Sequence, residues 1–395
     1  MRILMLNNEF PPLGGGMGTA NKALFDALAD YPDIEVDLIT SALGAHREAR
    51  RFSGRIQIFG VPVWNRNIHH STNRELLTYA VQALPLAYRL HRRQAYDLCF
   101  AWSTVPAGGV ALSLKRLCGL PYQVWVSGPD IPGFEQRYRA IYPLLTPTIR
   151  SIWRGATAVI AKCAEEITMM QRVVPGLEIT LIPNGVDLCA FQPAAPPPES
   201  EPLRIICVAR LIERKGQHHL IEAIKRLSDA GVDIQLELVG TGDAHAALEA
   251  QTRRLGIADR VVFSGYVPRE NLPAHYNAAD VFVLPSFNEG LSLAALEALA
   301  SGLPLVLSRT GGTTDLVEEG VNGLTFEWGN VPALTEHLRR LAGDRALVRR
   351  MGAQSRRRAK RFGWPAITER FVELFEAQVA GRRLGAPASM QSEPS

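Results

Sequence analysis

The strand–turn–helix pattern that recurs along this chain is clearest in the stretch Ala279-Asp-Val-Phe-Val-Leu-Pro-Ser-Phe-Asn-Glu-Gly-Leu-Ser-Leu-Ala-Ala-Leu-Glu297. Its apolar first third predicts a buried strand, and the high helix propensity of residues 291–300 predicts a helix that ends at Gly302 and Pro304. A strand that leads through a short turn into a helix is the building block of α/β folds.

The same alternation runs along the chain, with strand-length apolar runs at residues 3–6, 36–40, 98–101, 122–126, 158–161, 204–208, 235–239, 261–264, 281–284 and 305–308. Helical patterns between these runs predict parallel sheets covered on both faces.

A chain of 395 residues is too long for one ordinary core, and the proline-dense segment Phe191–Pro202 predicts a linker. We therefore expect an α/β protein of two doubly wound, Rossmann-like domains, residues 1–190 and 203–363, which face a central cleft. A helix over residues 364–380 is expected to pack back on the first domain, and residues 381–395 are expected to be disordered.

The composition is typical of a globular enzyme, with 47% hydrophobic and 21% charged residues. The net charge of +4 gives no reason to expect a nucleic-acid partner, although a weak attraction to anionic lipid stays open. The five cysteines are scattered without metal-ligand spacing, so we expect reduced thiols and no zinc. No apolar run is long enough to span a membrane. We expect a cytoplasmic protein, with peripheral contact at the inner membrane surface left open.

Two glutamates in the opening stretch suggest the kind of ligand. Glu289 precedes the predicted helix, whose N-terminus would offer N–H groups and a positive dipole end to a phosphate, and Glu297 projects from the helix. Carboxylates accept hydrogen bonds from hydroxyls, so this arrangement fits a sugar nucleotide. The segment 308–315 has a second strand, glycine turn and helix start that could share the ligand. The structural alternative is one capping and one exposed glutamate.

Two further segments could approach an anion. Residues 11–21 form a glycine-rich turn after the first strand, but they do not satisfy the dinucleotide fingerprint, and a plain tight turn is the alternative. Arg210 and Lys215 follow the first strand of the second domain, where open α/β sheets bind ligands. They could hold a diphosphate, with a solvated basic loop as the alternative. Glu213 and Arg214 are expected to be solvated.

Taken together, these segments resemble retaining glycosyltransferases of family 4, which have the GT-B fold. The resemblance covers nearly the whole chain, from Gly14 to Trp364. Further matching motifs are Ile182-Pro-Asn-Gly-Val-Asp187, Val239-Gly-Thr-Gly242 and Phe263-Ser-Gly-Tyr-Val267.

The resemblance implies a donor site formed by Gly15, Gly16, Arg210, Lys215, Gly240, Val267, Glu289, Gly290, Leu291, Ser292 and Glu297. In it, Arg210 and Lys215 would hold the diphosphate. Glu289 would accept hydrogen bonds from the transferred sugar, and Glu297 from the ribose. Catalysis would fall to Glu289, Lys215 and Arg210.

The acceptor side departs from the resemblance. Many relatives carry a histidine in an H-G-x-D stretch, whereas this chain has Val126-Ser-Gly-Pro-Asp130. Ser127 cannot replace imidazole as a cation or base, so its role stays open. Asp130 is the remaining candidate for contact with the acceptor hydroxyl.

The expected activity is transfer of a hexosyl unit from a UDP- or GDP-sugar to a glycan or lipid-linked acceptor, with retention of configuration. Such a reaction belongs to glycan, polysaccharide or glycolipid biosynthesis. No metal or other cofactor is expected, because the basic residues and the helix N-terminus could neutralise the diphosphate. Two alternatives stay open: a sugar-nucleotide epimerase or phosphorylase of similar fold, and a non-catalytic subunit that binds the nucleotide sugar.

Overall fold

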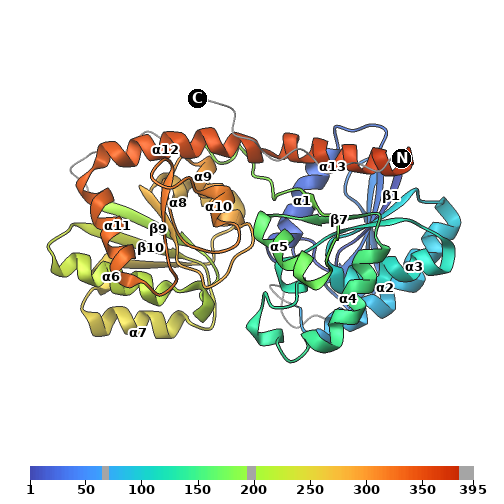
Figure 1. Cartoon of the computed structure of the whole chain (residues 1–395), viewed down its shortest axis with the longest axis horizontal. Coiled ribbons are helices and arrows are strands. Elements are labelled where there is room, and N and C mark those ends of the chain that lie inside the picture. Colours follow the sequence, from blue (N-terminus) through green and yellow to red (C-terminus); the bar gives the residue numbers. More distant parts are fainter. Residues whose placement is uncertain (65–70, 194–201, 382–395) are drawn as a thin grey trace. The chain divides into compact units, whose positions relative to one another are not determined.

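The computed structural model describes residues 1–64, 71–193 and 202–381 (Figure 1). It divides into two compact units, one of residues Met1–Pro183 with the segment from Trp364 onward, and one of residues Asn184–Gly363. Most of the proline-dense linker and nearly all of the expected disordered tail lie outside the described residues.

The first unit is built on an eight-stranded sheet of order β3-β4-β2-β1-β5-β6-β7-β8. The strands are β1 Arg2–Leu6, β2 Glu35–Ala42, β3 Glu48–Arg51, β4 Ile56–Pro62, β5 Leu98–Ala101, β6 Tyr122–Trp125, β7 Ala158–Ala161 and β8 Thr180–Leu181. All neighbours are parallel except the β3–β4 pair, and in the central strand Ile3 is in register with Val36 and Leu98.

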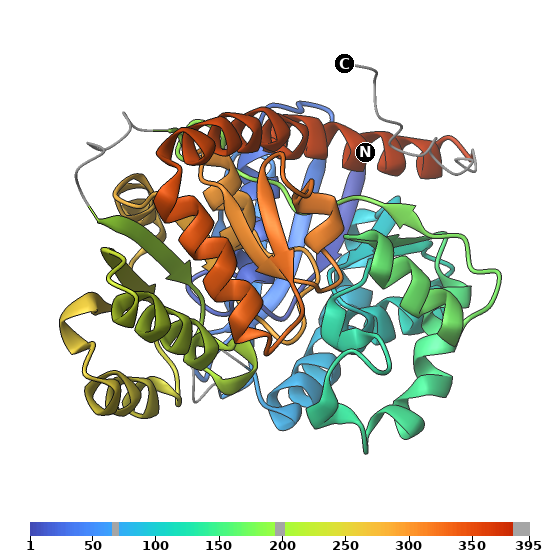
Figure 2. The same ribbon diagram turned by 60° about the vertical axis from the view of Figure 1, so that its left-hand side comes forward.

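Helices cover both faces of this sheet (Figure 2). One face carries α1 Gly16–Leu28 and α13 Trp364–Val379, and the other carries α2 Asn73–Gln94, α3 Gly109–Cys118, α4 Tyr142–Gly155 and α5 Ala164–Val173. Short helical turns lie at Thr104–Gly108, Gly128–Asp130 and Gln136–Tyr138. The rings of Phe371 and Phe375 from α13 lie 5.7 and 5.3 Å from the ring of Phe100 on β5.

The second unit has a six-stranded, wholly parallel sheet of order β11-β10-β9-β12-β13-β14. The strands are β9 Leu203–Val208, β10 Ile234–Val239, β11 Val261–Gly265, β12 Val281–Leu284, β13 Leu305–Ser308 and β14 Gly323–Phe326. The helices are α6 Gln217–Asp229, α7 His245–Leu255, α8 Leu272–Asn277, α9 Leu293–Ala300, α10 Thr313–Leu316, α11 Val331–Gly343 and α12 Arg345–Ala359. The strand order reverses between β9 and β12, which is where such sheets bind ligands.

The second unit begins before the proline-dense segment. The N–H of Val186 donates to the carbonyl of Phe362 at 2.7 Å, and Phe191 is buried in the core of this unit. Residues 184–190, which the sequence led us to assign to the first domain, therefore pack with the second. The proline pattern indicates where the chain is exposed, whereas the apolar residues ahead of it decide with which core they pack.

No helix in residues 1–64, 71–193 and 202–381 is long and apolar enough to cross a membrane.

Candidate functional site

Four loops meet at the carboxyl edge of the second sheet, after β9, β10, β12 and β13. Close contacts between them leave no room for side chains. Gly216 has a φ of +69°, and a Cβ added to it would lie 2.1 Å from the carbonyl oxygen of Pro285. A Cβ on Gly312 would lie 2.0 Å from the carbonyl oxygen of Gly290. The loop after β12 is therefore packed between its neighbours on both sides.

The helix that follows this loop begins two residues later than the sequence predicted. Ser292 is the N-cap of α9, and its hydroxyl accepts from the N–H of Ala295 at 3.3 Å. The backbone N–H groups of Gly290, Leu291 and Ser292 have no hydrogen-bond partner among the residues that the structure describes. This end of α9 thus offers N–H donors to a ligand, which is the chemistry that an anion requires.

Lys215 and Glu289 form an ion pair beside these donors. The ammonium group of Lys215 contacts Oε1 of Glu289, which also accepts from the hydroxyl of Ser286 at 2.9 Å. The side chains of Lys215 and Glu289 are only 13% and 17% exposed. The structure therefore brings together two predicted site residues from loops 74 positions apart in the chain.

The surroundings of Glu289 favour its charged form. Burial acts to raise the pKa of its carboxyl, but the charge and hydrogen bond of Lys215, the Ser286 hydroxyl and the charge of Arg214 outweigh burial, and the pKa is lowered. Glu289 is therefore an ionised hydrogen-bond acceptor rather than a proton donor at neutral pH.

The loop after β9 differs in part from the expectation. Arg210 is exposed just beyond β9, and its carbonyl accepts from Nε2 of Gln217 at 3.0 Å. Arg214, which we expected to be merely solvated, donates to Oδ1 of Asn288 at 3.1 Å, and its carbonyl accepts from the N–H of Phe287 at 2.7 Å. Arg214 therefore holds the loop after β12, residues 285–292, in place. We call this segment the glutamate loop. No local sequence pattern indicates this role of Arg214.

Glu297 lies on α9 and is only 4% exposed. One of its oxygens accepts from the hydroxyl of Tyr276 at 3.1 Å, and the other pairs with Arg269 at 3.1 Å. Burial raises the pKa of the Glu297 carboxyl, opposed by the charge of Arg269 and the hydrogen bond from Tyr276. Each carboxylate oxygen can accept a second hydrogen bond, so these contacts leave acceptor capacity for a ligand.

One residue that the sequence reasoning did not assign supports the glutamate loop through a buried hydrogen bond. Nδ2 of Asn184 donates to the carbonyl oxygen of Leu291 at 2.9 Å, and both residues are buried. Asn184 belongs to the Ile182–Asp187 motif, so the signal was present in the sequence. The role of Asn184 could be assigned only from the fold, because 107 residues separate the two partners.

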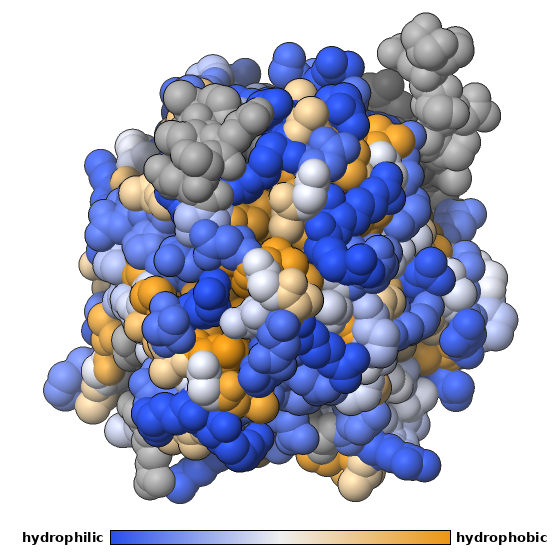
Figure 3. All heavy atoms as spheres, turned by 90° about the vertical axis from the view of Figure 1, so that its left-hand side faces the viewer, coloured by the Kyte–Doolittle hydropathy of each residue, from blue (hydrophilic) through white to orange (hydrophobic). Residues whose placement is uncertain are grey.

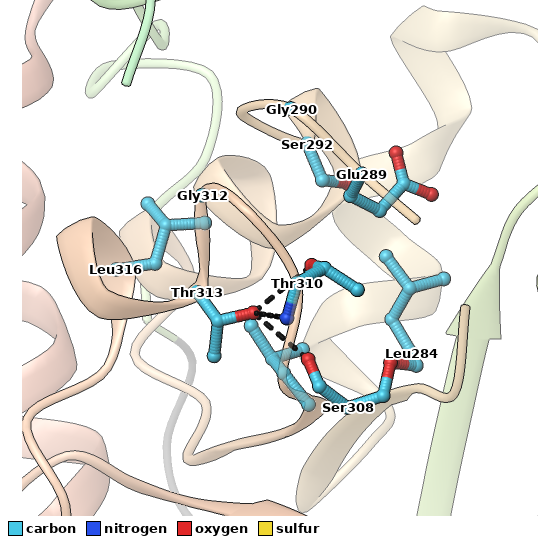
Figure 4. Close-up of a pocket in the computed structure, with 10 residues that line it drawn as sticks. Leu284, Glu289, Gly290, Ser292, Ser308, Thr310, Gly312, Thr313 and Leu316 are labelled. Atoms are coloured by element: carbon cyan, nitrogen blue, oxygen red, sulfur yellow. Dashed lines mark hydrogen bonds between the residues drawn. The ribbon is translucent and has the colours of Figure 1, made fainter. Parts of the chain in front are cut away.

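A pocket lies between this loop and the next helix start (Figure 4). It is lined by Leu284, Glu289, Gly290, Ser292, Leu307, Ser308, Thr310, Gly312, Thr313 and Leu316. The hydroxyl of Thr313 accepts from the N–H of Thr310 at 3.0 Å and donates to the carbonyl of Ser308 at 2.8 Å. The segment 308–315 therefore adjoins the glutamate loop.

Gly240 and Val267, the other predicted donor-site residues of this unit, follow β10 and β11. The N–H of Gly240 donates to the carbonyl of Gly265 at 2.7 Å, which holds these two strand ends together. Val267 lies two residues beyond Gly265 and is partly buried.

In the first unit, the glycine-rich turn leads directly into α1. Gly15 is the N-cap of α1, Gly16 is its first residue, and the N–H of Gly15 donates to Oε2 of Glu9 at 3.1 Å. A carboxylate thus lies where the start of α1 would attract an anion.

Asp130 lies at the carboxyl edge of the first sheet. Its Oδ2 accepts from the N–H groups of Thr104 at 2.7 Å and Ser127 at 3.1 Å, so it joins the loops after β5 and β6. Burial raises the pKa of Asp130 to about 6, although these hydrogen bonds and the charge of Lys162 oppose the shift. Ser127 contributes its backbone to this arrangement.

Within the described part of the chain, no three His, Cys, Asp or Glu side chains are grouped so that they could hold a metal ion.

Comparisons with known proteins place this geometry in a family. Residues 191–358 match the family described as glycosyl transferases group 1, and residues 15–185 match the glycosyl transferase 4-like domain. The chain is 33% identical over 419 residues to glycogen synthase of Mycobacterium tuberculosis H37Rv, an alignment that covers 98% of this chain and 97% of that protein.

Two solved structures have the same fold. Sucrose-phosphate synthase from Thermosynechococcus elongatus superposes with a TM-score of 0.83 at 24% identity, over 96% of this chain and 100% of that one. Anabaena HepE in complex with UDP-glucose superposes with a TM-score of 0.74 at 22% identity, over 95% and 100%. The chain therefore belongs to the glycosyl transferases group 1 family and is a family 4 glycosyltransferase with the GT-B fold.

Proposed function

We propose that the protein transfers a hexosyl unit from a UDP- or GDP-sugar to an acceptor hydroxyl, with retained anomeric configuration and without a metal ion. The observation that carries this proposal is the Lys215–Glu289 ion pair, which lies beside the unpartnered N–H groups at the start of α9. A cation and N–H donors suit a diphosphate, and an ionised carboxylate suits sugar hydroxyls. The UDP-glucose complex of HepE supports a donor of this class.

The donor would replace the ion pair by separate contacts of the same kind. Lys215 would turn from Glu289 to the diphosphate, and Arg210 would join it from the end of β9. Glu289 would then accept hydrogen bonds from the hexose. Lys215 would exchange one anionic partner for another, and Glu289 would exchange the ammonium group for hydroxyl donors. Neither charge is then left buried without a partner, which avoids a cost of several kcal/mol.

The chemistry needs a stabilised leaving group. The bond between the anomeric carbon and the diphosphate oxygen breaks, and its electron pair goes to the diphosphate. The acceptor oxygen bonds to the anomeric carbon on the same face, and its proton passes to the departing phosphate oxygen. Lys215, Arg210 and the N–H groups of the α9 start would meet the growing negative charge, which is electrostatic preorganisation.

The ribose and the acceptor would lie at the remaining candidates. Glu297 would accept from the ribose hydroxyls with the capacity that Tyr276 and Arg269 leave. Asp130 would lie near the acceptor, a glycan or lipid-linked hydroxyl, and its backbone hydrogen bonds suggest that it shapes the loop as well as contacting the substrate.

A direct test is a panel of UDP- and GDP-sugars, with thermal shift for binding and mass spectrometry for transfer to glycan and lipid-linked acceptors. A true donor should raise the melting temperature by mass action. Product formation should need an acceptor, persist in EDTA and give the donor's anomeric configuration by NMR. Conversion without an acceptor would favour an epimerase, dependence on inorganic phosphate a phosphorylase, and binding without turnover a non-catalytic subunit. Each of these outcomes would overturn the proposal.

A further inference from the structure

The positive charge of the chain is concentrated on three helices of one layer. α2, α3 and α4 carry eight Lys and Arg residues but a single acid, Glu75, which is buried in the N-terminal capping box of α2. The remainder of the chain has 35 basic and 38 acidic residues, so these three helices account for more than the entire net charge of +4.

These helices lie side by side on one face of the first sheet. Their buried residues belong to one core cluster, and contacts join α2 to α3 and α3 to α4 (Figures 1 and 2). Their outer surfaces therefore form one continuous face of the first unit, which we call the basic face.

The basic face also exposes large apolar side chains. Those more than half exposed are Leu77 at 67%, Val81 at 65%, Leu117 at 62% and Leu144 at 80%. On α2, Leu77 and Val81 lie one helical turn apart and point outward, with Arg74 before them and Arg92 after them on the same side of the helix. An apolar centre between arginines is the reverse of an ordinary solvent-exposed helix surface.

A groove between α3 and α4 gathers three of the arginines. It is lined by Arg116 and Leu112 from α3 and by Pro147, Arg150, Ser151, Arg154 and Gly155 from α4. Arg116 donates to Oγ of Ser151 at 3.2 Å, and Nε of Arg150 donates to the carbonyl of Val173 at 3.0 Å. None of the three guanidinium groups contacts a carboxylate among the described residues. The groove thus presents positioned but unneutralised cations.

Arginines of α12 differ from those of the basic face in their partners. α12 also carries six arginines, but Arg356 donates to three backbone carbonyls and Arg345 pairs with Asp280, so these charges are used inside the second unit. The side of the second unit formed by α6, α7 and α11 is mostly hydrophilic with small apolar patches (Figure 3). An apolar and purely cationic surface is a feature of the basic face.

We propose that the basic face docks the protein on a bilayer of anionic lipids, with Arg116, Arg150 and Arg154 receiving phosphate headgroups and Leu77, Val81, Leu117 and Leu144 entering the interface. A lipid surface fits because it joins negative charge to an apolar layer within a few ångströms, and this face offers the complement of both. Soluble anions would explain the arginines but not the exposed leucines.

The test is co-sedimentation of the full chain with phosphatidylcholine vesicles that contain or lack phosphatidylglycerol, at low and high salt. Binding should require phosphatidylglycerol and weaken as salt rises. The triple variant Arg116→Gln/Arg150→Gln/Arg154→Gln should bind these vesicles at least about tenfold more weakly, since each arginine near an anionic surface adds several-fold to the affinity.

A matched control separates position from net charge. Arg253→Gln/Arg254→Gln/Arg340→Gln removes the same charge from exposed sites of the second unit and should bind vesicles like the parent chain. The variant Leu77→Ser/Leu144→Ser keeps every charge and should also bind more weakly, because its apolar insertion is lost. Melting curves would establish that each variant is folded.

Three results would overturn the proposal: no binding of the parent chain to anionic vesicles, equal loss in the control and groove variants, or unchanged binding of the leucine variant. Pairing of chain copies through this face in sedimentation velocity would overturn it as well. The proposed sugar transfer is assayed separately, as donor turnover without vesicles, and the groove variants should leave it unchanged. Failure of one proposal can therefore be told from failure of the other.

Discussion

At the scale of single residues, the site consists of charged groups that neutralise each other. Lys215 and Glu289 are both largely buried and paired, and the lowered pKa of the Glu289 carboxyl favours its charged form beside the Lys215 ammonium. Such a pair is poised to exchange partners, because a ligand that carries an anion and hydroxyls can satisfy both groups at once.

Lys215→Ala should lower kcat/KM for the donor about 10²- to 10³-fold, which is the size expected for one lost charge-stabilising donor. The measurement is steady-state donor turnover. Lys225→Ala is the matched control, because Lys225 pairs with Asp229 on the exposed side of α6 and should turn over normally. Normal turnover in Lys215→Ala would remove this residue from the reaction.

Glu297→Gln should act mainly on donor binding. The amide keeps an acceptor for the Tyr276 hydroxyl but loses the Arg269 ion pair and one carboxylate oxygen, and a ribose contact changes little during reaction. We expect KM for the donor to rise about tenfold with kcat nearly constant, the effect of losing one hydrogen bond to a charged group. A fall in kcat at constant KM would instead place Glu297 at the reacting sugar.

Sequence predicted the charged residues of the site better than the residues that hold them. Lys215, Glu289 and Glu297 stand in patterns that can be read locally. Asn184 and Arg214 could not be assigned, because each acts on a loop more than 70 residues away. The partner of such a residue exists only once the strands are ordered in the sheet.

At the scale of elements, the loops at the carboxyl edge depend on backbone contacts that admit no side chain. Gly216→Ala combines a left-handed φ with a Cβ 2.1 Å from the Pro285 carbonyl. We expect it to lower the free energy of unfolding by more than the roughly 1–2 kcal/mol of conformational strain alone, and to weaken donor binding.

The control for this substitution is Gly256→Ala in the same unit. Gly256 has a φ of +67°, close to that of Gly216, but an added Cβ would meet nothing within 4 Å. It should therefore show only the strain. Urea denaturation of both variants measures the difference, and equal losses would mean that the contact with Pro285 does not matter.

Most strands could be predicted because they are buried apolar runs, but four were missed. β4, with the sequence Ile56-Gln-Ile-Phe-Gly-Val-Pro62, has a largely apolar pattern that could have been read, whereas the other three lack one for physical reasons. β3 has the sequence Glu48-Ala-Arg-Arg51 and is wholly exposed, so it lacks any apolar pattern. β14 begins at a glycine, and β8 is only two residues long. These edge strands owe their conformation to the neighbours with which they pair, which local propensity does not contain.

At the scale of the whole molecule, pH should act on the two units with opposite sign. Burial raises the pKa of Asp130 in the first unit to about 6, so the folded state holds this proton more tightly than the unfolded chain, whose aspartates titrate near about 4. Its contribution to stability is present below about pH 4 and is lost as the pH rises through 6. Glu289 in the second unit has a lowered pKa, so its contribution to stability is present at neutral pH and is lost as the pH falls through this lowered pKa.

Asp130→Asn tests the first of these effects. The free energy of unfolding of the parent chain should decline between about pH 4 and 7 more steeply than that of the variant, which has no proton to lose at this position. Urea denaturation at several pH values gives both slopes. Parallel slopes would show that Asp130 titrates normally in the folded protein.

The return of α13 to the first unit has a consequence for biosynthesis. Phe371 and Phe375 complete the core around Phe100, yet they are synthesised only after the whole second unit. The second unit is continuous in sequence and can finish folding as soon as it is made, whereas the first must wait for its closing helix until the second unit has been synthesised. A nascent chain arrested before Trp364 should therefore be protease-resistant only in its second half. A premature stop codon at this point would leave the N-terminal half incompletely folded and bound by chaperones.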